Sequence, residues 1–260
     1  MQLAFEKYQG TGNDFILTDG RATEVIPGEE QIKFLCDRHF GIGADGFMIL
    51  LPHGKHAFGM KYYNADGRES TLCGNGGRCM IEYARSLGLF GKQGTFLATD
   101  GIHQGRILDN GLISLKMNDV DRVEPCLNGY YLDTGSPHYV EFVTDVSRLN
   151  VTEAGQQIRH HEAFKPAGTN VNFAEIMGPG KLYVRTFERG VEAETLSCGT
   201  GVTASAISSV FYTGHRNRNF TIETRGGRLK ISFSVNREGI FQNVWLTGPA
   251  IHVFSGTITV

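Results

Sequence analysis

The stretch ESTLCGNG, residues 69–76, returns later in the chain as ETLSCGTG, residues 194–201. In each copy a glutamate precedes the cysteine by four residues, a threonine lies between them, and Gly-x-Gly follows the cysteine. A stretch with helical periodicity or small residues comes next in both copies. The pattern therefore predicts a strand, a turn and the first turn of a helix. We interpret each copy as half of an active site.

The two cysteines, Cys73 and Cys198, would lie at the amino ends of these helices. The first amides of a helix have no acceptor within it and point outward with the positive end of its dipole, so they bind a carboxylate and stabilise thiolate over thiol. A lone cysteine is most often a small buried hydrophobic residue. Two copies of Gly-x-Gly favour function, because glycine leaves little side chain to pack and lets a ligand approach the backbone.

The repeat extends well beyond the two cysteine turns. Cys73 and Cys198 are 125 residues apart, and so are Thr99 and Thr224. Each element expected in the first copy has a counterpart in the second. These pairs are glycine turns leading to strands at 12–19 and 135–145, strands at 47–51 and 173–177, strands at 61–64 and 183–188, helices at 76–88 and 201–214, and strand-turn segments at 96–101 and 221–227. A further helix is expected at 27–39 with proline at its start. The sequence therefore predicts a tandem duplication, with one half at 1–119 plus 250–260 and the other at 120–249.

Composition excludes several classes of protein. A chain of 260 residues with 40% hydrophobic and 20% charged residues and a net charge of -2 has no broad electrostatic bias toward nucleic acid or membrane. We expect a small-molecule partner. No run approaches 18 apolar residues, and the amino terminus has no basic region followed by an apolar block, so a cytoplasmic location is expected. The five cysteines show no CxxC spacing, which favours reduced thiols over a disulfide framework.

Two homologous halves with one cysteine turn each would bring those turns to opposite sides of a ligand. A reaction that needs two equivalent groups on opposite faces of one carbon is the inversion of a stereocentre. One group removes a proton and the other donates one. The duplication therefore favours an epimerase or racemase.

The sequence resembles the diaminopimelate epimerases over nearly its whole length. The motifs that carry the resemblance are Gly10–Phe15, Arg38–Asp45, Asn64–Gly67, Cys73–Gly76, Asn170, Glu188–Gly190 and Cys198–Gly201. The resemblance implies an α/β (α+β) fold of two pseudo-symmetric halves, each a curved, mostly antiparallel sheet wrapped around a central helix. It also implies interconversion of LL- and meso-diaminopimelate, in lysine and peptidoglycan precursor synthesis, without a cofactor.

The resemblance also implies roles for individual residues. Cys198 would be the thiolate that takes the Cα proton in the LL to meso direction, and Cys73 the thiol that donates one. The residues implied to hold the reacting carboxylate through their amides are Gly74, Asn75, Gly199 and Thr200. The residues implied to hold the rest of the substrate are Asn13, Asn64, Asn170, Glu188 and Arg189. Glu188 and His138 would help to set the protonation states of the thiols.

The chain departs from the common family pattern at three places. Gly46 stands where many members carry glutamine, Ser136 stands where many carry asparagine, and the segment 190–194 is one residue longer than usual. All three bear on the end of the substrate far from the reacting carbon. Asn13, Asn64 and Asn170 would then carry more of the recognition there.

Other candidate residues receive structural interpretations. Cys36 and Cys79 are expected in the core, although Cys79 could act as a resolving thiol. The run His160-His161-Glu162 could bind a metal, but adjacent side chains point to opposite sides of an extended segment, so a surface position is expected and no metal is assigned. Cys126 has no assigned role.

Two alternative functions remain open from the sequence. One is a racemase of another amino acid on the same fold, such as a proline racemase relative; those typically have histidine after the first Cys-Gly, and Asn75 favours diaminopimelate instead. The other is a non-enzymatic dithiol redox sensor, which explains the thiols but not the duplicated Gly-x-Gly anion sites. A homodimer is a possible assembly.

Overall fold

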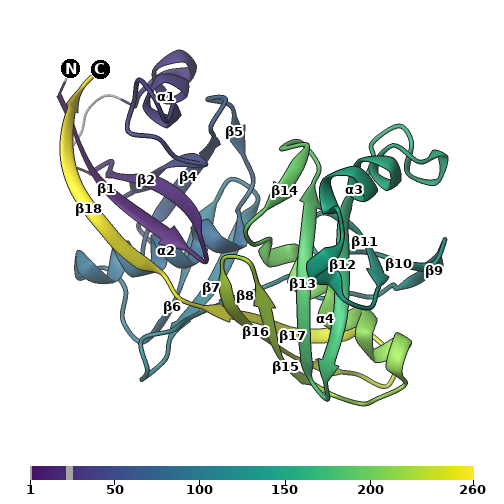
Figure 1. The fold of residues 1–260 in the computed structure, drawn as a ribbon. Helices are drawn as coiled ribbons and strands as arrows, with labels where there is room; N and C mark the ends of the chain where they lie inside the picture. The colour runs from purple at the N-terminus through teal and green to yellow at the C-terminus, as the bar shows by residue number, and fades with distance from the viewer. Residues whose placement is uncertain (1, 22–25) are drawn as a thin grey trace. The chain divides into compact units, whose positions relative to one another are not determined.

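The computed structural model describes residues 2–21 and 26–260, and its contacts divide the chain into two compact units (Figure 1). The first unit is Met1–Leu115 with Gly248–Val260, and the second is Lys116–Thr247. Each unit consists mostly of strands with few helices. The expected α/β fold class is therefore confirmed.

The first unit contains one mostly antiparallel sheet. Its strands are β1 (Gln2–Gly10), β2 (Asn13–Asp19), β3 (Gly46–Leu51), β4 (Gly59–Asn64), β5 (Glu69–Ser70), β6 (Gln93–Ala98), β7 (Gly101–Ile107), β8 (Ile113–Lys116) and β18 (Ile251–Thr259). The pairing runs β18-β1-β2-β3-β4-β6-β7-β8, with the short β5 also on β4. The β2–β3 and β4–β6 pairs are parallel. The segment between each parallel pair crosses over the sheet, and α2 lies in the second crossover.

The second unit repeats this pairing strand for strand. Its strands are β9 (Glu124–Cys126), β10 (Gly129–Asp133), β11 (Pro137–Phe142), β12 (Asn170–Gly178), β13 (Lys181–Glu188), β14 (Ala193–Thr195), β15 (Asn219–Thr224), β16 (Gly227–Val235) and β17 (Phe241–Gly248). The pairing runs β9-β10-β11-β12-β13-β15-β16-β17, with β14 also on β13. Here the β11–β12 and β13–β15 pairs are parallel, as β2–β3 and β4–β6 are in the first unit. The repeat found in the sequence is thus a repeat of topology.

The central helix expected in each unit packs on its sheet. Helix α2 (Gly74–Ser86) packs against β1, β2 and β3, and helix α4 (Gly199–Thr213) packs against β10 to β13 and β16. Each begins two residues earlier than the sequence predicted, because the cysteine itself is the N-cap residue. Helix α4 ends where Gly214 adopts a left-handed conformation (φ 68°). Helix α4 is buried along most of its length, but Phe211 and Tyr212 in its last turn are exposed.

The expected helix at 27–39 is shorter in the structure. Helix α1 (Glu29–Cys36) starts after Gly28, whose N–H is bound by the Gln31 side chain at 2.9 Å. It ends because Asp37 turns to an extended conformation. The Asp37 carboxylate then accepts hydrogen bonds from the backbone N–H groups of His39 and Phe40. The second unit carries α3 (Val151–Arg159) and two 3₁₀ turns, η1 (Val146–Arg148) and η2 (Glu162–Phe164).

Buried apolar residues form the core of each unit. In the first unit Ile32, Leu35 and Cys36 of α1 pack with residues of β1, β2 and β3, so the expected core position of Cys36 is confirmed. In the second unit the apolar side of α4 packs on the sheet, and a separate cluster lies under α3. Across residues 2–21 and 26–260, none of the helices has the length and apolar character that crossing a membrane requires.

Candidate active site

The first half of the candidate site is the turn between β5 and α2. Cys73 has an extended backbone (φ -86°, ψ 131°), and the first backbone hydrogen bond of α2 runs from Gly77 N to Cys73 O at 2.7 Å. The first turn of α2 contains no acidic residue. Cys73 Sγ donates to Asn13 Oδ1 at 3.6 Å, and Asn75 Nδ2 donates to the same oxygen at 3.2 Å. The structure thus brings Asn13, Cys73 and Asn75 together.

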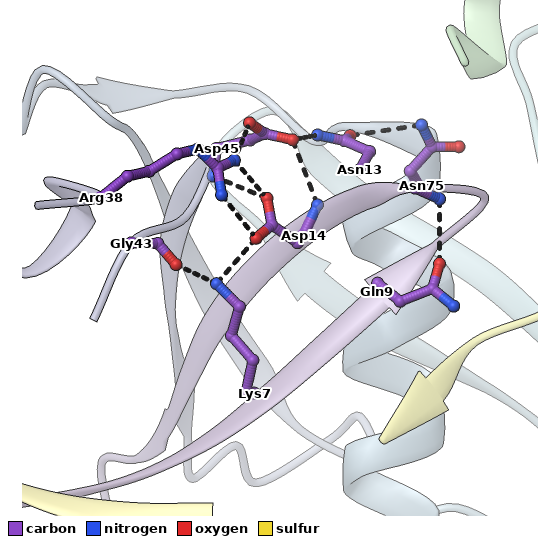
Figure 2. Close-up of polar contacts among 9 residues, drawn as sticks. Lys7, Gln9, Asn13, Asp14, Arg38, Gly43, Asp45 and Asn75 are labelled. Atoms are coloured by element: carbon purple, nitrogen blue, oxygen red, sulfur yellow. Dashed lines mark hydrogen bonds and ion pairs between the residues drawn. The ribbon is translucent and has the colours of Figure 1, made fainter. Parts of the chain in front are cut away.

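A cluster of charged side chains binds the amide nitrogen of the Asn13 side chain (Figure 2). Asn13 Nδ2 donates to Asp45 Oδ2 at 2.6 Å, and Arg38 bridges Asp45 and Asp14 at 2.8 and 2.7 Å. Lys7, which is only 5% exposed, pairs with Asp14 at 2.8 Å and also donates to Gly43 O. Burial opposes ionisation of Asp14, but the hydrogen bonds from Arg38 and Lys7 outweigh it and lower its pKa to about 2.

Arg78 is a fully buried cation five residues after Cys73. Its guanidinium donates to Gly74 O, Asn75 Oδ1 and Pro249 O at 3.2, 3.0 and 3.3 Å. Burial lowers its pKa to about 10, so it stays charged at neutral pH. Its positive charge adds to that of the helix terminus. The matching residue of the second unit is Thr203, which donates to Gly199 O at 2.9 Å and carries no charge.

The second half of the candidate site is the turn between β14 and α4. Cys198 is 8% exposed, and the first backbone hydrogen bond of α4 runs from Val202 N to Cys198 O at 3.0 Å. Its Sγ lies 3.4 Å from Thr200 Oγ1, and Thr134 Oγ1 donates to Thr200 O at 3.0 Å. The first turn of this helix also lacks acidic residues. Both cysteines therefore cap the central helix of their unit.

The residues beneath the two turns differ in polarity. The strand registers match three positions of β2, β3 and β4 with three of β11, β12 and β13: Phe15 with His138, Met48 with Asn172, and Tyr62 with Thr186. A Cβ at Gly76 would lie 2.3 Å from Met48 Cε, and a Cβ at Gly201 would lie 2.2 Å from Asn172 Oδ1. We call Phe15, Met48 and Tyr62 the apolar floor of the first turn, and His138, Asn172 and Thr186 the polar floor of the second.

His138 and Asn172 are both fully buried in this polar floor. Asn172 Nδ2 donates to His138 Nδ1 at 3.0 Å, and Thr186 Oγ1 donates to Asn172 Oδ1 at 3.0 Å. Burial, and secondarily the charge of Arg189, lowers the pKa of His138 to about 3. The imidazole is therefore neutral at pH 7.

The remaining predicted substrate residues lie at strand ends near these turns. Asn64 ends β4 and is exposed. Asn170 begins β12 but is 6% exposed, and its amide bonds protein groups on both sides: Nδ2 donates to Pro137 O at 3.0 Å, and Oδ1 accepts from Arg189 N at 2.9 Å. Glu188 accepts from Thr195 Oγ1. Asn170 thus positions the Arg189 backbone, and its contact with substrate stays a prediction.

At Gly46, where many family members carry glutamine, this protein leaves no room for a side chain. A Cβ there would lie 2.5 Å from Tyr62 Cε2 and 2.7 Å from Tyr63 O, so a longer side chain needs the neighbouring strand to move. Ser136 does not simply shorten a side chain. Its Oγ lies 3.1 Å from His138 Nε2 and 3.4 Å from Thr200 Oγ1, and this connects the polar floor to the cysteine turn.

Sequence reasoning missed three residues of this environment: Asp45 as the anchor of Asn13, Arg78 as a buried charge, and Asn172 as the partner of His138. Aligning the two repeats position by position would have indicated Asn172, because a polar residue stands there against methionine in the first copy. Arg78 stands against threonine in the same alignment. Asp45 gave no such signal, since its contact depends on how β2 and β3 pair.

The other candidates behave as structural residues. Cys79 is fully buried, and burial raises the pKa of its thiol to about 12, so it is a core residue rather than a reactive thiol. His161 Nδ1 accepts from Ala163 N at the start of η2, and His160 is exposed 3.8 Å from Glu192. No group of three metal-ligating side chains gathers within the described parts of the chain.

Comparisons with known proteins agree with this architecture. The diaminopimelate epimerase family model matches residues 5–122 and 130–253. A diaminopimelate epimerase from Flavobacterium psychrophilum is 46% identical over 97% of this chain and 98% of its own, and one from Aquifex aeolicus is 34% identical over 99% and 98%.

Solved structures share the fold at low identity. A phenazine biosynthesis protein of the PhzF family from Bacillus anthracis has a TM-score of 0.79 at 15% identity, with full coverage of both chains. A probable proline racemase from Agrobacterium radiobacter has a TM-score of 0.72 at 15% identity, over 99% of this chain and 92% of its own. These likenesses support the fold, and the family match is far more specific. The chain belongs to the diaminopimelate epimerase family, whose members are isomerases.

Proposed function

We propose that the protein interconverts LL- and meso-diaminopimelate by moving a proton between Cα and two cysteines. The observation that carries this proposal is that Cys73 and Cys198 are each the N-cap residue of the central helix of their unit. Family membership supports the substrate. The duplicated arrangement supports a reaction with one proton-transfer group on each side of a single carbon.

In the LL to meso direction the Cys198 thiolate takes the Cα proton while the Cys73 thiol gives its proton to the opposite face. In the reverse direction the two groups exchange roles. The amides of Gly74, Asn75, Gly199 and Thr200 hold the reacting carboxylate, so that two helix termini face the negative charge that develops as the C–H bond breaks. The protein groups themselves supply this stabilisation.

The distal end of the substrate is an ammonium and a carboxylate. Glu188 and Arg189 are adjacent residues of opposite charge at the end of β13, which suits both groups. Arg189 is held through its backbone N–H by Asn170 Oδ1. Asn13 and Asn64 add amide contacts at the ends of β2 and β4.

The test is to incubate the protein with LL-diaminopimelate in deuterium oxide. We expect meso-diaminopimelate that carries deuterium at the inverted carbon, because the donated hydrogen comes from a thiol equilibrated with solvent. Proline and lysine serve as control substrates and should not exchange. Absence of both meso product and deuterium would overturn the proposal, and exchange of proline instead would favour the related racemases.

We also infer a cytoplasmic location and a homodimer. The location is supported by the biosynthetic function that the names of the relatives imply.

The dimer is supported by β18, which pairs with β1 and exposes Ile251, Val253 and Phe254. Sedimentation at several concentrations tests the assembly, and a Val253→Lys variant should shift it toward monomer. An unshifted sedimentation coefficient would contradict this interface.

A further inference from the structure

The hydrogen bonds beneath Cys198 have a fixed direction, which starts at Asn172. Asn172 Nδ2 lies 3.0 Å from both Tyr139 O and His138 Nδ1. A backbone carbonyl only accepts, so this end of the amide is the NH₂ group. Thr186 Oγ1 donates to the other end at 3.0 Å, which agrees. His138 Nδ1 is therefore an acceptor and carries no proton.

The remaining hydrogen of the neutral imidazole is on His138 Nε2, 3.1 Å from Ser136 Oγ. Ser136 Oγ receives a second hydrogen bond, from Asn170 Nδ2 at 3.3 Å. The orientation of Asn170 is fixed in the same way, because its Nδ2 also faces Pro137 O at 3.0 Å. Both lone pairs of the serine oxygen are then occupied.

Ser136 has one hydrogen left to donate, and Thr200 Oγ1 lies 3.4 Å away to accept it. With that hydrogen pointing at Thr200, the Thr200 hydroxyl cannot point back at Ser136. Cys198 Sγ lies 3.4 Å from Thr200 Oγ1 on its other side. The direction of donation is thus set from Asn172 to Thr200, and a Thr200 hydroxyl that accepts from Ser136 keeps its own hydrogen to donate to the sulfur.

We propose that Ser136 and Thr200 form a hydroxyl relay, oriented by His138 and Asn172, that donates its last hydrogen to Cys198 Sγ and so favours the thiolate of Cys198. The proposal rests on the proposed function, in which Cys198 acts as the base toward LL-diaminopimelate. Ser136 and Asn172 are positioning residues in this relay. A hydrogen bond donated to a charged acceptor is stronger than one to a neutral acceptor, which is why the relay stabilises thiolate over thiol.

The first unit shows the opposite polarity. Asp45 can only accept, so it fixes Asn13 Nδ2 toward itself and Asn13 Oδ1 toward Cys73. Cys73 Sγ is then the donor, which suits a thiol. The two halves of the duplicated chain thus differ so that the free protein favours the Cys73 thiol and the Cys198 thiolate, the pair that begins the LL to meso direction.

Charged groups on the strands around this turn include Asp133 at the end of β10, Glu188 with Arg189 at the end of β13, and Glu194 on β14, which pairs with Arg185 and Arg225. Gly135 N donates to Asp133 at 2.7 Å, Thr195 Oγ1 donates to Glu188, and the Arg189 charge acts on His138. These groups and His138 stay unchanged in the variants below. A shift common to those variants therefore reports the relay.

The experiment compares Ser136→Ala and Thr200→Val with Thr200→Ser, which keeps the hydroxyl. Ser208→Ala is the matched control, because Ser208 Oγ is buried in the same helix and makes no hydrogen bond to any described residue. The measurement is the rate of iodoacetamide alkylation at Cys198 and at Cys73 across pH, followed separately by peptide mass spectrometry. Circular dichroism confirms that each variant is folded.

We expect the midpoint of the Cys198 profile to rise by about one pH unit in Ser136→Ala and Thr200→Val, so that alkylation below the midpoint slows about tenfold. Thr200→Ser and Ser208→Ala should keep the wild-type profile, and the Cys73 profile should not move. An unchanged Cys198 profile in folded Ser136→Ala and Thr200→Val would overturn the relay. The assay uses no substrate, so it separates the relay from the proposed function: failure of deuterium exchange with LL-diaminopimelate counts against the function alone.

Discussion

Asp45 Oδ2 lies 2.6 Å from Asn13 Nδ2 and thereby decides which end of the Asn13 amide faces Cys73. A carboxylate cannot donate, so the carbonyl end of Asn13 is turned to the thiol and to Asn75 Nδ2. Arg38 and Lys7 in turn hold the carboxylates of this cluster in place. An ion cluster beside β2 therefore orients the amide that faces Cys73.

We predict that Asp45→Asn lowers kcat/KM about tenfold, because the asparagine can donate as well as accept and no longer fixes Asn13. The Asp45 side chain is 42% exposed, so its contribution to the free energy of unfolding should be below about 1 kcal/mol. Steady-state kinetics and thermal melts measure both effects. Asp109→Asn is the control, since Asp109 forms a similar pair with Lys92 at an exposed position. Unchanged kcat/KM would show that Asn13 needs no anchor.

Cys73→Ala and Cys198→Ala should each abolish epimerisation and leave the fold intact. Loss of one acid-base group costs about 100-fold or more. Both residues are N-caps without a side-chain capping bond, so alanine removes no helix cap. Turnover and circular dichroism test the two parts. Near wild-type turnover in either variant would contradict a mechanism with two thiols.

The pKa of Asp14 makes stability depend on acid pH. Its pKa is lowered from 3.8 to about 2 in the folded protein, nearly two units at about 1.4 kcal/mol each. A depressed carboxyl pKa stabilises the folded state above the unfolded value, and this contribution of about 2 kcal/mol is lost as pH falls from about 4 toward 2. Urea unfolding at several pH values measures it.

In Asp14→Asn this part of the pH dependence should disappear. The wild-type and variant free energies of unfolding should therefore converge by about 2 kcal/mol between pH 4 and pH 2. Asp109→Asn, which changes a nearly fully exposed carboxylate, should run parallel to the wild type. Parallel curves for Asp14→Asn would mean that the cluster does not depress this pKa in solution.

Much of the fold could be predicted from the sequence, because the two cysteine turns and the 125-residue offset mark the duplication directly. Helix ends were less predictable. The expected helix at 27–39 is longer than α1, because the side chain of Asp37 binds the following amides and Pro27 lies before the cap. The polar floor could not be predicted because Asn172 lies just before the expected strand at 173–177, and only its hydrogen bonds with Thr186 and His138 show its use. Contacts that depend on strand register could not be read from one sequence.

The two floors also predict different tolerance to alanine. A Cβ at Gly76 meets the flexible end of Met48, whereas a Cβ at Gly201 meets Asn172 Oδ1, which three hydrogen bonds to Asn172 hold in place. Gly201→Ala should therefore destabilise the protein by about 2 kcal/mol or more, through overpacking and loss of buried hydrogen bonds. Gly76→Ala should cost less than about 1 kcal/mol, because alanine favours the helix and methionine can move aside. Thermal and urea unfolding of both variants measures the two losses in free energy of unfolding. Equal costs would contradict the difference between the floors.

The last prediction concerns the distal end of the substrate, where Gly46 leaves no side chain and Ser136 is engaged by His138 and Thr200. Recognition then depends more on Asn64 and on Arg189. Arg189→Ala and Asn64→Ala should each lower kcat/KM for LL-diaminopimelate at least tenfold, which corresponds to about 1.4 kcal/mol of lost transition-state stabilisation. Arg237→Ala, in a turn between β16 and β17, is a matched control for loss of an arginine and should leave kcat/KM unchanged.

Substrates without the distal amino acid group, such as lysine and 2-aminopimelate, should turn over poorly, because unpaired polar groups cost about 1 to 3 kcal/mol each. If lysine were epimerised as efficiently as LL-diaminopimelate, Asn64 and Arg189 would not read the distal centre, and the specificity would have to lie at the reacting carbon alone.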